Sequence, residues 1–142
     1  MPKADQINWQ PISQMNLIAS MIEDSLNDTR EHLGTLTRAK AQPHVLDDAT
    51  IDRVEQVHTE QMEFIDIYAQ QIDRWRSEKP SASQARELDR MKQQNQELLA
   101  ITANVLALAG ELRKGTIERV LGMSDLELGL QSLLGTQPPS RG

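Results

Sequence analysis

The sequence contains no cysteine, and only 3% of its residues are aromatic. The absence of thiols excludes disulfides, thiolate zinc sites, iron–sulfur clusters and cysteine nucleophiles. Glycine (7 residues) and proline (6 residues) are also scarce, so the composition is unlike that of fibrous or loop-rich chains. What is present is a chain of 142 residues, 38% hydrophobic and 25% charged, which has the size and composition of one globular domain.

Long apolar segments are missing as well. Residues 1–6 are polar and lack the apolar core of a secretory signal. The longest apolar stretch, Leu98–Ala109, is interrupted by Thr102 and Asn104 and is too short to span a bilayer. We therefore expect a cytoplasmic protein with no membrane partner, a location that the lack of cysteine also fits.

Acidic residues outnumber basic ones by 21 to 15, which gives a net charge of −6. The segment 47–66 is strongly acidic and contains a single base, Arg53, whereas 86–114 is slightly basic. Two such helices can pair within the chain or across a dimer, or the acidic face can simply be solvated. Because the chain shows no basic stripe for neutralising phosphates, we expect no nucleic-acid partner.

Helical periodicity dominates the chain, whereas no stretch alternates apolar and polar residues as a strand does. Three long helices are expected, and their boundaries follow from start and stop signals: Pro11 to about 36 with looser chain over 37–47, Asp47 to Pro80, and Ser81 to Gly115. Their apolar seams are Met15, Ile18, Ile22, Leu26, Thr29, Leu33 and Leu36; then Ile51, Val54, His58, Gln61, Ile65, Tyr68, Ile72 and Trp75; then Leu88, Met91, Asn95, Leu98, Ile101, Val105, Leu108 and Leu112.

The start and stop signals have a physical basis. Proline suits a first helical position, because its missing N–H would have no intrahelical partner there. Asp47, Asp48 and Thr50 are candidate caps for the second helix, and Ser81 with Gln84 forms a capping box for the third. Gly115 is expected to close the third helix.

Two short helical pieces are expected after Gly115. The first is 116–121, and the second opens with a capping box at Ser124–Glu127 and ends at Gly135. Leu121 belongs to the first piece, and Leu126, Leu130, Leu133 and Leu134 belong to the second. The expected organisation is a flexible arm over 1–10, a single helical-bundle domain over 11–135 and a disordered tail over 136–142.

The expected fold is therefore all-α: an antiparallel bundle of three long helices with one or two short C-terminal helices. The short pieces cover only part of such long helices. Leu99 and Leu106 add a second apolar row to the third helix, and this row needs another partner. A homodimer supplies that partner most economically, so we expect dimerisation to complete the bundle.

Polar residues interrupt the seams at His58 and Gln61 on the second helix and at Asn95 and Thr102 on the third. Buried polar groups are costly unless they are paired, and in bundles they often specify register. We expect a network across helices among His58, Gln61 and Asn95, either as a register device or as the lining of a polar ligand pocket.

One motif points to metal chemistry. Glu55 and His58 form a Glu-x-x-His sequence, which places a carboxylate and an imidazole on one helix face, as in di-iron bundles. The motif occurs once, so a metal site would need carboxylates from other helices or the second copy in a dimer. Nucleophile elbows and phosphate-binding glycine loops are absent from the sequence. We therefore expect neither an enzyme nor a bound cofactor, and metal binding at Glu55 and His58 is the alternative hypothesis.

Candidate interaction residues lie at three places. Trp75 falls on a seam between Arg74 and Arg76, so it is either a core residue or an anchor of the kind that dominates interfaces. Trp9, before the first helix, is either a lid on the bundle end or a second anchor. The C-terminal leucines exceed what one face of a short helix buries, which favours docking on the bundle, on the second copy or on a protein partner. The leading hypothesis is a non-enzymatic adaptor, chaperone or regulatory subunit.

Long acidic helices followed by a leucine-rich, glycine-containing C-terminal segment are similar in design to small bacterial export chaperones, including flagellar ones. The resemblance is architectural. No motif carries it, and it assigns no residue of this chain to a role.

Overall fold

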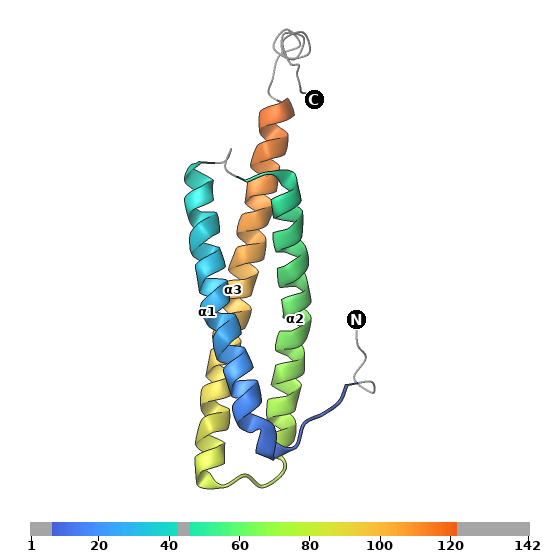
Figure 1. Cartoon of the computed structure of the whole chain (residues 1–142), viewed down its shortest axis with the longest axis vertical. Helices are drawn as coiled ribbons and strands as arrows, with labels where there is room; N and C mark the ends of the chain where they lie inside the picture. Colours follow the sequence, from blue (N-terminus) through green and yellow to red (C-terminus); the bar gives the residue numbers. More distant parts are fainter. Residues whose placement is uncertain (1–6, 43–45, 122–142) are drawn as a thin grey trace.

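The computed structural model describes residues 7–42 and 46–121, and of residues 116–121 it describes only the backbone. A short 3-10 helix, η2 (Ile12–Gln14), precedes three long helices, α1 (Met15–Ala41), α2 (Asp48–Arg76) and α3 (Ala82–Leu121). No strand occurs in these ranges, so the predicted all-α class with three long helices is confirmed (Figure 1). None of the described helices combines the length and the apolarity that crossing a membrane requires.

The predicted starts of α2 and α3 carry their capping bonds, whereas the start predicted at Pro11 is wrong for α1, which begins at Met15 after the 3-10 turn. The Asp47 side chain accepts a hydrogen bond of 2.8 Å from the Thr50 N–H at the start of α2. At the start of α3, the Gln84 N–H donates to Ser81 Oγ at 3.1 Å, and the Ser81 N–H donates to Gln84 Oε1 at 2.9 Å. These bonds satisfy backbone donors that have no partner inside the helix, which is why short polar residues stand at these positions.

Two predicted helix ends are wrong. The chain from Thr37 to Ala41 is helical rather than loose, because Ala39 is still buried and the bases Arg38 and Lys40 suit the last turn of a helix. Gly115 does not close α3, and 116–121 continues that helix instead of forming a separate one. Glycine inside a helix costs about 1 kcal/mol relative to alanine, and Gly115 does not adopt the left-handed backbone that a glycine stop requires.

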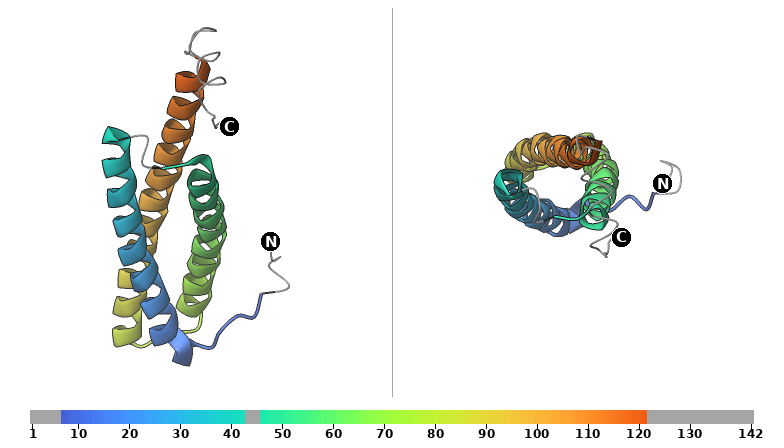
Figure 2. Two further views of the ribbon diagram at one scale, coloured as in Figure 1. Left: turned by 45° about the horizontal axis from the view of Figure 1, so that its top comes forward. Right: turned by 90° about the horizontal axis from the view of Figure 1, so that it is seen from above.

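The helices are arranged around α3. Both α1 and α2 pack along α3, whereas α1 and α2 make much less contact with each other over the described residues. The chain runs in one direction along α1 and α3 and in the opposite direction along α2 (Figure 1). The helices α1 and α2 lie close together where α1 begins and α2 ends, which we call the closed end. They diverge toward the end of α1 and the start of α2, which we call the divergent end (Figures 1 and 2).

The buried side chains form three clusters along the length of α3. The cluster at the closed end of α1 and α2 contains Met15, Ile18, Ala19, Ile22, Tyr68, Ile72, Trp75, Leu88 and Met91. The small middle cluster contains Leu26, Ile65 and Leu98. The cluster at the divergent end contains Leu36, Ile51, Val105, Leu108, Ala109 and Leu112. Nearly all of these residues are on the predicted seams, because the period of an α-helix places residues three and four apart on one face.

Residues 7–10 lie against the closed end. The Trp75 Nε1–H donates to the Gln10 carbonyl at 3.0 Å, and the Gln10 N–H donates to Gln71 Oε1 at 2.7 Å. The Arg74 guanidinium lies 4.1 Å from the centre of the Trp9 ring, which is the geometry of a cation–π contact. The segment before α1 therefore supplies the polar partner that the fully buried Trp75 indole needs.

A polar bridge joins all three helices in the middle of the molecule. Gln61 Nε2 of α2 donates to Thr29 Oγ1 of α1 at 2.9 Å and to Thr102 Oγ1 of α3 at 2.8 Å. Each hydroxyl in turn donates to a carbonyl four residues earlier in its own helix, at 2.7 Å. Both threonines are almost completely buried, so the Gln61 amide satisfies groups that water cannot reach.

Replacing Gln61 with leucine tests this bridge. Gln61→Leu keeps the approximate volume but leaves two buried hydroxyl oxygens without donors, so we expect the free energy of unfolding to fall by about 1–3 kcal/mol. The triple variant Gln61→Leu, Thr29→Val, Thr102→Val removes the unpaired groups as well, and we expect it to recover most of the loss. Urea unfolding followed by circular dichroism measures both. A triple variant no more stable than the single one would contradict this account.

Candidate functional site

The strongest candidate site is the groove between α1 and α2, which we call the α1–α2 groove. An outer pocket of about 220 Å³ lies toward the divergent end, and an inner pocket of about 260 Å³ lies nearer the middle. The outer pocket is lined by His32, Thr35, Leu36, Leu46, Thr50, Arg53, Val54, Val57 and His58. The inner pocket is lined by Ser25, Val57, Glu60, Gln61, Phe64 and Tyr68.

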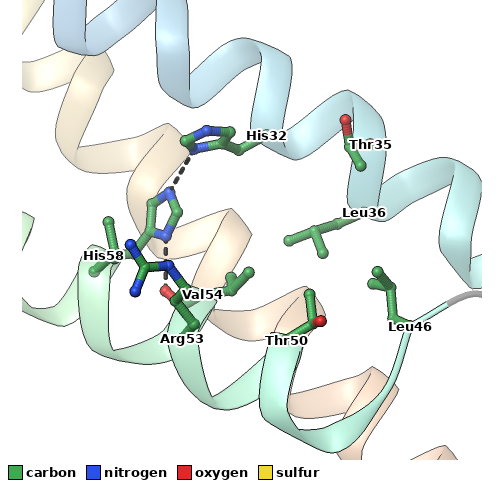
Figure 3. A pocket seen from close by; sticks show the side chains of 9 residues that line it. His32, Thr35, Leu36, Leu46, Thr50, Arg53, Val54 and His58 are labelled. Atoms are coloured by element: carbon green, nitrogen blue, oxygen red, sulfur yellow. Dashed lines mark hydrogen bonds between the residues drawn. The ribbon is translucent and has the colours of Figure 1, made fainter.

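The outer pocket has an apolar wall and a polar, cationic wall. Leu36 of α1 and Val54 of α2 face each other across it, with Leu46 at its outer end (Figure 3). His32 and Arg53 lie on the other side, together with the ring of His58. A pocket of this kind suits an apolar group that carries a nearby acceptor or negative charge.

A histidine pair crosses the groove. His32 Nδ1 of α1 and His58 Nε2 of α2 are 3.2 Å apart, and their rings meet edge to face (Figure 3). His58 Nδ1 lies 2.8 Å from the Val54 carbonyl, which only accepts hydrogen bonds. The proton of neutral His58 is therefore on Nδ1, and its Nε2 accepts a hydrogen bond from the Nδ1–H of His32.

Burial is the main influence on the pKa of His58. His58 is only 2% exposed, whereas His32 is on the surface of α1. Burial lowers the pKa of His58 below its usual value, the Val54 carbonyl acts in the opposite direction, and a positive charge on His32 lowers the pKa further. The neutral form of His58, which accepts from His32, is thus the form that the fold favours.

Several large apolar side chains in and beside the groove are exposed to solvent. Val57 and Phe64 of α2 are 41% and 52% exposed, and both line the inner pocket. On α1, Leu17 and Met21 are 53% and 40% exposed. They precede Ser25 at intervals of four residues, so they lie on the helix face that lines the inner pocket. Neighbouring exposed large apolar side chains on two helices are typical of a protein-interaction surface or a ligand-binding groove.

The two predicted metal-binding residues have different partners. Glu55 Oε1 accepts a hydrogen bond of 2.6 Å from Arg113 of α3, which also pairs with Asp52 and whose pKa these carboxylates raise. The His58 ring instead contacts His32 of α1. In the ranges that the structure describes, no three acidic or histidine side chains gather as a metal site would require. Metal binding at Glu55 and His58 stays a prediction.

Of the predicted interaction residues, Trp75 is the one whose side chain the structure describes. Trp75 is completely buried, which agrees with its interpretation as a core residue, and it contacts Gln10 rather than solvent. Leu121 is the last residue of α3, and the structure describes its backbone but not its side chain. The other four predicted interaction residues lie outside the described residues: Leu126, Leu130, Leu133 and Leu134.

The polar seam residues bond across helices, but with partners that differ from the expected ones. Asn95 Nδ2 donates to the Ile65 carbonyl at 2.9 Å, Gln61 bonds to two threonines, and His58 bonds to His32.

The α1–α2 groove was not predicted from the sequence. The available signal was the set of apolar residues beside the seams, Leu17, Met21, Val57 and Phe64, which broaden each apolar face toward the neighbouring helix.

The low pKa of His58 makes stability depend on pH. Unfolded His58 takes up a proton below about pH 6.5, whereas the folded chain resists protonation until a lower pH. The free energy of unfolding is therefore expected to fall as the pH decreases from 7.5 to 5.5, above the range in which most carboxylates titrate. We expect His58→Gln to show a smaller decrease, measured by urea unfolding at several pH values. Superimposable pH profiles for the two proteins would contradict this assignment.

Comparisons with known proteins do not identify a relative: no protein-family model, no curated protein sequence and no solved structure matches the chain. The functional inference therefore depends on the α1–α2 groove itself.

Proposed function

We propose that the chain is a non-enzymatic protein-interaction module whose α1–α2 groove binds an amphipathic helix. The observation that supports this proposal is the combination of two helices whose backbones make little close contact and exposed apolar side chains along the groove between them. Val57 and Phe64 line the groove and are exposed, and the exposed Leu17 and Met21 precede the pocket residue Ser25 on α1 at intervals of four residues.

A helix is the occupant that suits the groove. Three helices with an open side leave the place that a fourth helix fills in a four-helix bundle. A helix with apolar residues at i, i+3 or i+4, and i+7 presents a stripe that matches a long apolar groove, and its own backbone needs no partners from the groove. The mainly apolar lining, with Arg53 and Glu60 at the borders, gives the groove affinity for such a stripe and polar contacts that fix its direction.

Binding to a library of displayed amphipathic helices tests this function. We expect the full chain to select peptides with large apolar residues at helical spacing. Phe64→Asp should weaken their binding roughly tenfold to hundredfold, because burying a side chain of that size contributes about 1.5–3 kcal/mol. Thr59→Asp is the matched control, since Thr59 is exposed on the same helix but lines neither groove pocket. Failure to select such peptides, or binding equally strong in Phe64→Asp, would contradict the proposed function.

We also propose that two copies associate through the outer face of α3. Leu99 is 45% exposed there, and Leu106 is half-buried, as an apolar row without a partner in one chain would be. The α3 face and the α1–α2 groove are separate surfaces, so a dimer formed in this way leaves the groove accessible.

Native mass spectrometry tests the association and the metal alternative together. We expect the untagged full chain to give a species of twice 16.0 kDa without additional mass, and Leu99→Gln to shift the population toward the single chain. A single-chain mass in the wild type would contradict dimerisation. Additional mass equal to a transition metal, lost in His58→Ala, would instead favour the metal-binding function.

A further inference from the structure

Arg53 is the single base of the acidic segment 47–66, and it lines the outer pocket of the α1–α2 groove. A charged residue on a helix pairs with residues three or four positions away, because these lie beside it on the helix surface. The structure gives Arg53 no ion pair with any residue that it describes. All four positions that could supply such a pair are uncharged: Ala49, Thr50, Gln56 and Val57.

The rest of the outer pocket does not neutralise this guanidinium either. Among the described residues, its lining contains no carboxylate. His58 uses both of its ring nitrogens, one toward the Val54 carbonyl and the other toward His32 (Figure 3). The N–H donors of Arg53 therefore remain available to an acceptor from outside, and a carboxylate is the acceptor that a guanidinium binds most strongly.

An opposite charge lies two turns further along the same face of α2. Glu60 lines the inner pocket and follows Arg53 by seven residues, a rise of about 10 Å along the helix. Val57 lies between them in the sequence and lines both pockets. Glu60, like Arg53, has no ion pair over the ranges that the structure covers. The groove thus presents a cation, an apolar side chain and an anion in that order.

We infer that the occupant of the α1–α2 groove is a helix of another protein that carries an acidic and a basic residue seven positions apart beside its apolar stripe. Its acidic residue binds Arg53 in the outer pocket, its basic residue binds Glu60 in the inner pocket, and an apolar side chain between them contacts Val57. The inference rests on the proposed function and adds to it the charge pattern of the partner.

The geometry of helices gives this pattern its spacing. A helix that lies along the groove rises by the same 1.5 Å per residue as α2, so two of its residues seven apart reach Arg53 and Glu60 together. A helix with two acidic residues at these positions places like charges together at Glu60, and a helix with two basic residues does so at Arg53. Such like-charge contacts are a means by which binding surfaces reject other partners.

Selection from a defined helix library tests the inference. Each displayed helix is about 18 residues long, or five turns, and has a fixed leucine stripe. Two positions beside the stripe, seven apart, vary among Glu, Lys and Gln. We expect the full wild-type chain to enrich helices with one Glu and one Lys, in either order because the helix can lie in either direction. We expect Arg53→Glu to enrich helices with two Lys instead, since both sites in the groove are then acidic.

Arg86→Glu is the matched control, because it changes the net charge by the same amount at an exposed residue that lines neither groove pocket. It should still enrich helices with one Glu and one Lys. A selected helix of this kind should bind Arg53→Glu roughly tenfold more weakly than the wild type, and its two-Lys version should recover the loss. This recovery also shows that the variant is folded.

The outcomes separate the inference from the proposed function. Helices that bind with no preference at the two variable positions, or an equal shift toward two Lys in Arg86→Glu, would overturn the inference while the proposed function stands. Failure of every leucine-stripe helix to bind would overturn the proposed function and the inference with it. A dimer seen by native mass spectrometry in the wild type and in Arg86→Glu but lost in Arg53→Glu would mean that a second copy occupies the groove, which also overturns the inference.

Discussion

The amide of Gln61 is the contact on which the arrangement of the three helices depends. It is the point at which α2 bonds to α1 and α3 at once, through Thr29 and Thr102. Both threonines are buried, and their own hydrogens are already donated within their helices, so only an amide at this level completes the set. A shift of α2 by one residue would leave these groups unpaired, which fixes how far along α1 and α3 the second helix can lie.

The same polar bridge explains why the groove is open. The helices α1 and α2 are joined across the groove by side chains rather than by close backbone packing: Gln61 reaches Thr29, and His58 reaches His32. The spacing of two packed helices depends on the side chains at their contact, which here include the polar pairs Gln61–Thr29 and His58–His32. Val57 and Phe64, which lie beside these bonds on α2, are consequently left half in solvent.

The sequence predicted the helices and their buried faces well, because these depend on local spacing and capping. Asp47 and Ser81 begin helices as expected, and almost every seam residue is buried. The side-chain contacts between different helices were not predictable in the same way. Periodicity says which residues share a face but not which helix opposes it, so the His32–His58 pair, separated by 26 positions, has no sequence signal. The prediction that α3 ends at Gly115 was wrong, because glycine permits a helix to end but does not require it to do so.

The two ends of the molecule differ in how completely their apolar side chains are covered. At the closed end, the indole of Trp75 is covered by residues 7–10, and the Gln10 carbonyl satisfies its N–H. At the divergent end, the described residues provide no comparable cover for the outer pocket, whose wall combines Leu36 and Val54 with Arg53. An apolar surface beside a cation is stable in water only at a cost that an amphipathic, acidic helix relieves. The closed end is thus the covered end of the molecule, and we expect the proposed partner helix to dock toward the divergent end.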